Sequence, residues 1–255
     1  MATYKKRGGK PKTKVEKQSQ LEENSTTAEV FNTLDEGASR TEAWVEKNQK
    51  YILITVGAVA LCVLGYLGYQ QFIQGPKESE AMNEMYQAQD YFEQALTATA
   101  KDSLYNLSLN GGEGQYGFLD IIDNYGGTPA GNLANYYAGM AYINTGEYQK
   151  AIDHLDDFKS DDAMLGPLAK GAIGDAFAQL GQPDDALGYY EKAVSLSDNE
   201  VTAPRFLLKA GLTAMSLNKF DVALKHFNRI NEEYPKSAEA TKANLYIGQA
   251  EAMQE

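Results

Sequence analysis

The stretch that decides the fold is ANYYAGMAYINTGEYQKAIDHL, residues 134–155. Two later stretches align with it: KGAIGDAFAQLGQPDDALGYY at 170–190 and KAGLTAMSLNKFDVALKHF at 209–227. The small residues that correspond, 35 and 37 residues apart, are Gly139, Gly174 and Gly211, and then Ala151, Ala186 and Ala223. Self-similarity at a period of this length indicates a helical repeat array, with one helix pair in each repeat.

The turns and helix starts of these repeats carry their own signals. Between the two expected helices lie Gly146, Gly181 and Asn218, at matching places. Pro167 and Pro204 are expected to open first helices and Pro183 a second helix, where a missing N–H costs nothing.

The small-residue and aromatic pattern resembles the tetratricopeptide repeat, W-x2-L-G-x2-Y followed by A-x3-F and P. The matching residues are Gly139, Tyr142, Ala151 and Leu155 in 132–165, Ile173, Gly174, Phe177, Ala186 and Tyr190 in 167–200, and Gly211, Ala223, Phe227 and Pro235 in 204–237. None of the three has the tryptophan. The resemblance implies an all-α fold in which residues 77–255 form a TPR-like α-solenoid, with about three full repeats and partial flanking repeats.

The flanking repeats are incomplete. ANLYIGQA at 243–250 copies ANYYAGMA at 134–141, so residues 237–254 are expected to be a lone first helix that caps the array. Upstream, residues 118–125 echo 227–234 and are expected to pair with a helix over 78–100, giving a degenerate repeat at 78–128. Between them lies a glycine-rich insertion, residues 101–117, in which the stretch 112–117 is interpreted as a flexible loop.

N-terminal to the array lies an apolar run, YILITVGAVALCVLGYLGYQQFI, residues 51–73, without a charged side chain. At about 1.5 Å per residue, a helix of this length crosses a hydrocarbon core of roughly 30 Å. The long segment before the run, and the lack of an A-x-A pattern after it, favour a retained transmembrane helix over a signal peptide. An amphipathic juxtamembrane helix is predicted over 26–50.

Residues 1–25 are predicted to be a disordered basic tail. Two interpretations of the tail stay open: it enforces orientation only, or it attaches to anionic lipid or an acidic partner.

Charge is distributed unequally about the run. Residues 1–50 hold ten Lys and Arg against eight Asp and Glu, whereas residues 74–255 hold thirteen against twenty-seven. Because basic residues favour the cytoplasmic side, the N-terminus is expected inside and the repeat domain in the periplasm of a bacterial inner membrane. The acidic domain argues against nucleic acid. The only cysteine, Cys62, lies in the run, so the repeat domain has no disulfide.

One face of the predicted span carries small residues. Gly57, Leu61, Gly65 and Gly68 recur at three- and four-residue spacing, which predicts a membrane helix-packing face. The alternative is that glycines are simply common in membrane helices.

Candidate chemistry is sparse. Residues 112–117 have the form G-x-G-x-x-G, but no βαβ unit surrounds them, as a dinucleotide site requires. His154 and His226 occupy the same repeat position and are expected to be partly exposed. No catalytic set, metal site or cofactor site is predicted, and the protein is not expected to be an enzyme.

The resemblance to the repeat family implies a peptide-binding groove lined by the first helix of each repeat. The residues placed there by register are Leu133, Tyr136, Met140, Ile143, Leu168, Asp175, Arg205, Leu208, Leu212, Met215, Leu245 and Met253. Flexible methionines suit a surface that adapts to varied apolar partners. The alternative is that several of these residues belong to the core beneath a shallow groove.

The whole arrangement, with the local sequence TEAWVEKNQKYILITVG at 41–57, resembles the YfgM-type ancillary subunit of the bacterial Sec translocon. The basic tail is longer than in that family, and the glycine-rich insertion is extra. The resemblance implies a non-enzymatic factor beside SecYEG that works with a PpiD-type periplasmic chaperone to receive unfolded client polypeptides. The alternative is a scaffold subunit of another cell-envelope machine, for secretion or outer-membrane assembly.

Overall fold

The computed structural model describes residues 26–254, with side chains from residue 41 onward. Within that range the secondary structure is helical, apart from an isolated bridge between Gly112 and Gln115. The predicted all-α fold class is confirmed. The chain divides into two compact units, Met1–Tyr69 and Gln70–Glu255, which are described separately.

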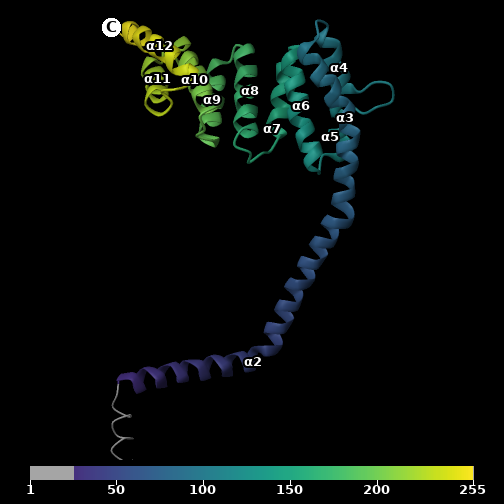
Figure 1. Cartoon of the computed structure of the whole chain (residues 1–255), viewed down its shortest axis with the longest axis vertical. Coiled ribbons are helices and arrows are strands. Elements are labelled where there is room, and N and C mark those ends of the chain that lie inside the picture. The colour runs from purple at the N-terminus through teal and green to yellow at the C-terminus, as the bar shows by residue number, and fades with distance from the viewer. Residues whose placement is uncertain (1–25, 255) are drawn as a thin grey trace, which may run out of the picture. The chain divides into compact units, whose positions relative to one another are not determined.

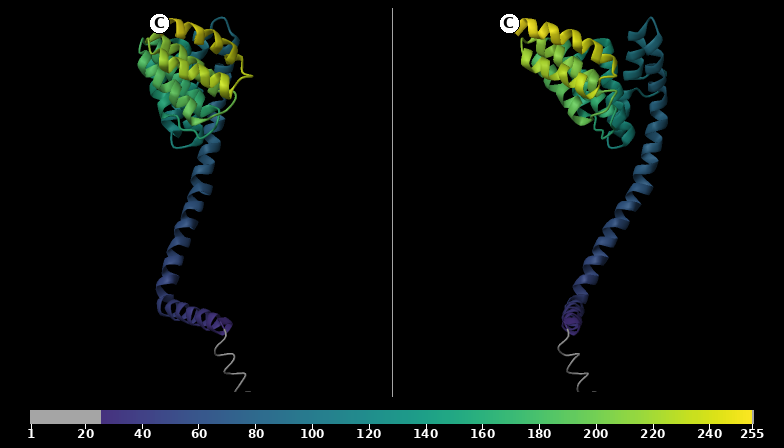
Figure 2. Two further views of the ribbon diagram at one scale, coloured as in Figure 1. Left: turned by 90° about the vertical axis from the view of Figure 1, so that its left-hand side faces the viewer. Right: turned by 60° about the vertical axis from the view of Figure 1, so that its left-hand side comes forward.

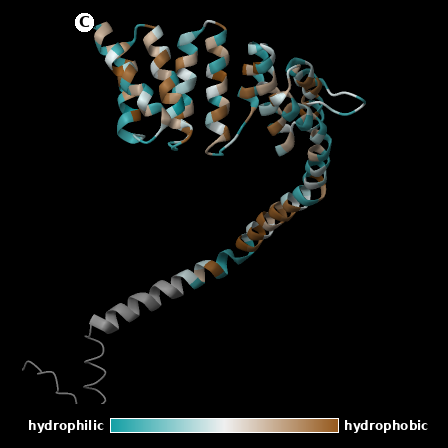
Figure 3. Ribbon diagram, turned by 45° about the horizontal axis from the view of Figure 1, so that its top comes forward, coloured by the Kyte–Doolittle hydropathy of each residue, from teal (hydrophilic) through white to brown (hydrophobic). Residues whose placement is uncertain are grey.

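The first unit contains the helix α2 (Thr26–Tyr69). It runs through residues 50 and 51 without a break, so the juxtamembrane segment and the beginning of the apolar run form one helix and not two. No proline or other helix breaker separates them in the sequence. Figure 3 shows the apolar run as a hydrophobic band. Among the residues with described side chains, one helical segment is long and apolar enough to cross a membrane. The basic tail, residues 1–25, lies outside the described residues.

The small-residue face of α2 is open in this structure. A Cβ atom added at Gly57, Gly65 or Gly68 would meet no atom within 4 Å, and Leu61 is exposed. Its role as a packing face therefore stays a prediction.

The second unit is a row of packed helices, in which each helix turns back against the one before it (Figures 1 and 2). Its elements are the π-helical turn η1 (Gln70–Gln74), α3 (Gly75–Thr97), α4 (Lys101–Asn110), α5 (Phe118–Tyr125), α6 (Pro129–Thr145), α7 (Tyr148–Asp157), α8 (Leu165–Gln179), α9 (Pro183–Leu196), α10 (Ala203–Ser216), α11 (Phe220–Glu233) and α12 (Ala238–Gln254). The pairs α6–α7, α8–α9 and α10–α11 are the three repeats. The helix α12 packs on α10 and α11.

The turn inside each repeat needs a left-handed residue. Gly146, Gly181 and Asn218 have φ values of 81°, 73° and 58°, and they are the three turn residues that align in the sequence. Glycine and asparagine are the residues that adopt this conformation most readily. The chain can therefore reverse within two or three residues, and the two helices of each pair lie side by side.

A glycine allows the two helices of each repeat to approach closely. A Cβ atom at Gly139 would lie 2.4 Å from Leu155 Cγ, at Gly174 2.7 Å from Tyr190 Cε1, and at Gly211 2.3 Å from Phe227 Cε1. In every pair, a bulky side chain of the second helix occupies the space that a glycine of the first helix leaves open. These three contacts fix the geometry of the repeats.

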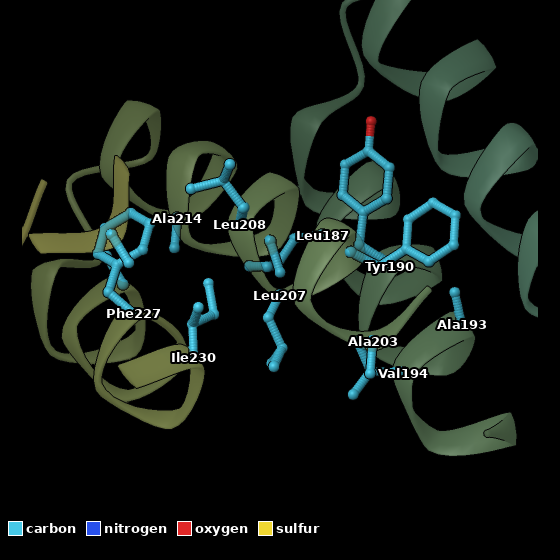
Figure 4. Close-up of a cluster of buried hydrophobic side chains, with 14 of the residues drawn as sticks. Leu187, Tyr190, Ala193, Val194, Ala203, Leu207, Leu208, Ala214, Phe227 and Ile230 are labelled. Carbon is cyan, nitrogen blue, oxygen red and sulfur yellow. The ribbon is translucent and has the colours of Figure 1, made fainter. Parts of the chain in front are cut away.

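The same side chains form the core between repeats. Figure 4 shows Tyr190 from α9, Leu207 from α10 and Phe227 from α11 converging in one buried cluster. A second cluster joins α3, α4, α5 and α6, and a third joins α7 and α8. Burying an aromatic or aliphatic side chain stabilises the fold by about 1.5–3 kcal/mol.

The prediction of an insertion over 101–117 is corrected for residues 101–110. Residues 101–110 form the helix α4, with Tyr105 and Leu109 each only 1% exposed, and α3 packs more extensively on α4 than on α5. The two buried side chains are four residues apart and therefore share one face of the helix. Only 111–117 is a loop, and Gly111 and Gly117 pass so close that a side chain at either would clash with backbone atoms.

Replacing Gly211 by alanine should destabilise the repeat domain by about 1–3 kcal/mol, because the new Cβ overlaps the Phe227 ring. Urea unfolding of the full protein in detergent, followed by circular dichroism, measures this. Gly188→Ala is the matched control in α9, because nothing lies within 4 Å of its Cβ position. Because alanine has a higher helix propensity than glycine, Gly188→Ala should raise the free energy of unfolding by up to about 1 kcal/mol. Equal stability of the two variants would contradict the close-approach account.

Candidate functional site

The candidate binding surface lies on the first helices of the repeats. Together α6, α8 and α10 carry three bases and one acid, and α6 has no charged residue at all. The second helices α5, α7, α9 and α11 carry eleven acids against four bases. The acidity of the domain is therefore concentrated on the second helices, and the first helices present an almost neutral, apolar surface.

The predicted groove residues differ in exposure. Half-buried side chains are Leu133, Tyr136, Met140, Ile143, Leu168, Asp175, Leu212 and Met215; exposed ones are Arg205, Leu245 and Met253. Leu208 is buried, at 8% exposure, so for this residue the core interpretation holds. The half-buried apolar side chains pack on the core clusters with one side and leave the other side open. We call the predicted groove residues other than Leu208 the first-helix face.

Asp175 does not present a free carboxylate to this face. Lys209 Nζ lies 2.5 Å from Asp175 Oδ1, and Tyr190 donates its hydroxyl to the same oxygen at 2.7 Å. Burial and the neighbouring carboxylate raise the pKa of Tyr190, so its hydroxyl stays protonated and donates. Asp175 thus links α8, α9 and α10, and its expected role in ligand binding stays a prediction.

Arg205 is the cation of the first-helix face, and its guanidinium lies 5.8 Å from the centroid of the Phe206 ring. It is exposed, and within the described side chains no carboxylate lies within ion-pair distance of it. Burial raises the pKa of Tyr136, and the positive charge of Arg205 opposes that rise.

The polar contacts between repeats were missed by sequence reasoning. Lys209 bonds to Asp175, Lys219 to Asp184 at 2.6 Å and His226 to Glu191 at 3.0 Å. The partners are 34 or 35 residues apart, slightly less than the 37 residues that separate the aligned glycines of these two repeats. A search for opposite charges at separations of 34 or 35 residues would have found the two lysine pairs.

The histidines have structural partners. His226 is buried, at 9% exposure, and not partly exposed as expected, because Glu191 of the preceding repeat covers it. His154 Nδ1 lies 3.0 Å from Asn135 Oδ1 and the ring stacks on Tyr142. In the part of the chain with described side chains, no cluster of three or more His, Cys, Asp or Glu could hold a metal ion.

Comparison with known proteins agrees with the helical repeat architecture. Models of the tetratricopeptide repeat match residues 133–162 and 171–238. The helical array is tetratricopeptide-like. Repeats of this kind indicate a protein-interaction module. None of the curated proteins matches the chain.

Solved structures with tetratricopeptide repeats are similar to the array. A putative kinesin light chain from Podosopora anserina, with nearly identical TPR-like repeats, shares 11% identity over 69% of this chain and 87% of its own, with a TM-score of 0.51. The first TPR of Spaghetti (RPAP3), bound to an HSP90 peptide, shares 25% identity over 48% and 93%, with a TM-score of 0.39. YrrB, a TPR protein with an unusual peptide-binding site, shares 21% identity over 66% and 83%, with a TM-score of 0.41.

The stability of the domain should fall as the pH falls below about 6.5, the ordinary histidine pKa. Burial lowers the pKa of His154 and of His226, so the unfolded chain binds protons that the folded chain does not. Urea midpoints of the full protein at pH 7.5 and 5.5 measure the loss. The double variant His154→Gln, His226→Gln should lose less over the same interval. A loss as large as that of the unmodified protein would contradict this assignment.

Proposed function

We propose that the protein is a membrane-anchored interaction module whose first-helix face receives extended segments of other polypeptides. The observation that carries this proposal is the combination of open, half-buried apolar side chains with one unpaired cation, on helices that carry little charge. Such a surface offers apolar contact sites and a single charged group. An arrangement of this kind suits weak and broad recognition.

The chemistry of the face defines its ligand. Met140 and Met215 have flexible thioether side chains that accommodate apolar groups of different shapes. Arg205 is suited to a carboxylate of the bound segment, since a guanidinium donates two parallel hydrogen bonds to a carboxylate. The preferred ligand is therefore an unfolded segment with apolar side chains and an acidic group.

The finer assignment is a place beside the Sec translocon. The unequal charge about residues 51–73 supports a cytoplasmic N-terminus and a periplasmic repeat domain in a bacterial inner membrane. The resemblance at 41–57 supports a YfgM-type subunit that contacts SecYEG and a PpiD-type chaperone and receives client polypeptides. A scaffold subunit of another cell-envelope machine is the second candidate, because the same anchor and repeat domain suit it equally well.

Copurification from gently solubilised membranes distinguishes these two assignments. Recovery of Sec subunits with the tagged full-length protein is the expected result, and recovery of another machine's subunits instead would favour the scaffold. Protease digestion of spheroplasts tests the topology, because a periplasmic repeat domain should be degraded while the cells stay intact. A protected domain would contradict the orientation.

Substituting Met140→Glu or Leu212→Glu should weaken binding of unfolded polypeptide about tenfold or more. A bound apolar side chain would bury the new carboxylate, which costs at least about 1.4 kcal/mol of binding free energy. Arg205→Glu should weaken binding of acidic segments and leave neutral ones unchanged. Fluorescence anisotropy with labelled peptides and the full protein in detergent measures both. Leu196→Glu is the control, because Leu196 is 54% exposed at the end of a second helix. Unchanged binding by the two glutamate variants would exclude the first-helix face.

A further inference from the structure

The loop between α7 and α8, residues 158–164, is joined to the repeats on both sides of it by asparagine side chains. Asn132 donates its amide to the backbone carbonyl of Lys159 at 2.7 Å and accepts a hydrogen bond from the Lys159 N–H at 2.9 Å. Asn199, in the loop between α9 and α10, donates to the backbone carbonyl of Ala163 at 2.9 Å. Both contacts between successive repeats are therefore closed by an amide.

The next contact of this kind leaves a cleft. Residues 234–237, between α11 and α12, form a shorter loop than 158–164 or 197–202. In the described part of the chain, no asparagine amide joins this loop to 197–202. A cleft of about 290 Å³ lies there, and its lining residues are Glu200, Glu233, Tyr234, Pro235, Lys236 and Ser237. This volume is close to the lower end of the range for small-molecule sites, about 300–1,000 Å³.

One wall of the cleft is held in place by contacts within the protein. Tyr234 donates its hydroxyl to Asp198, and Arg229 donates to the same carboxylate at 3.1 Å and to Glu233 at 2.7 Å. Burial and the hydrogen bond to Asp198 raise the pKa of Tyr234 to about 12, so its hydroxyl stays protonated and donates. Glu233 is paired with Arg229, and this wall therefore needs no ligand to keep its position.

Two other lining side chains, of opposite charge, have no partner. Among the described side chains, neither Glu200 nor Lys236 takes part in an ion pair or a side-chain hydrogen bond, and both are exposed. Ser237 lies directly before α12, whose first backbone N–H groups have no partner inside the helix and whose dipole favours an anion. The cleft thus offers a position for a cation at Glu200 and one for an anion at Lys236 and the start of α12.

We infer that this cleft binds a small zwitterion, an amino acid or a dipeptide, whose ammonium group pairs with Glu200 and whose carboxylate pairs with Lys236. A ligand with both charges neutralises both side chains, whereas a simple anion or cation would leave one of them unpaired. Tyr234 and Pro235 supply an apolar side for the side chain of the ligand. None of the lining residues belongs to the first-helix face, so this site does not depend on the function proposed for that face.

The test is isothermal titration calorimetry of the full protein in detergent, with L-leucine and L-alanyl-L-leucine as probes. The expected result is saturable binding of at least one probe, and the tighter of the two identifies the ligand as an amino acid or a dipeptide. The N-acetylated form of that probe lacks the ammonium group, and its amide lacks the carboxylate. Each should bind about tenfold more weakly or less, equivalent to at least about 1.4 kcal/mol.

The variants Glu200→Gln and Lys236→Gln should each weaken binding of the probe about tenfold or more. Lys242→Gln and Glu251→Gln are the matched controls, because both residues are exposed on α12 and neither lines the cleft. The controls should bind like the unmodified protein, and circular dichroism should show all four variants folded.

Three results would overturn the inference. The first is the absence of saturable binding by both probes, and the second is equal binding by the N-acetylated or amidated form. The third is binding that either Glu200→Gln or Lys236→Gln leaves unchanged, because the cleft would then recognise a single charge or none.

Discussion

The repeat domain depends on the close approach of two helices at one glycine in each repeat. The bulky side chain that covers this glycine also forms part of the core: Tyr190 lies over Gly174 and stacks on Phe206 of the next repeat, and Phe227 lies over Gly211 and stacks on Tyr246. One side chain thus sets the distance within a repeat and the packing to the next. Since interiors are packed to crystal-like density, a single added methyl group at the glycine affects both.

Polar contacts between repeats follow from this regular packing. Once the helices stack at a constant distance, residues slightly less than one period apart face each other, and Asp175, Asp184 and Glu191 meet Lys209, Lys219 and His226. The two lysine pairs, which are partly exposed, contribute little to stability, typically below about 1 kcal/mol each. The distribution of charge has a larger effect on the surface. The acids lie mainly on the second helices, and the first helices remain nearly uncharged and open to apolar ligands.

Much of the fold follows from the sequence, because the same glycine and turn residues recur at matching positions in each repeat. Gly139, Gly174 and Gly211 identify the helix pairs, and Gly146, Gly181 and Asn218 identify the turns. The helix α4 was missed because the glycines that follow it have a stronger loop signal than its two buried side chains, Tyr105 and Leu109. The role of Asp175 was missed because register places a residue on a face but does not show which side chain of the next repeat reaches it.

The two ends of the array differ in a way that follows from its one-dimensional construction. Each repeat contacts its neighbours only, so an end needs its own solution. At the N-terminal end, α3, α4 and α5 cover α6, and Glu78 of α3 accepts a hydrogen bond from the Ala130 backbone N–H at 3.0 Å, which satisfies the start of α6. At the C-terminal end, α12 keeps the glycine of a first helix and exposes it.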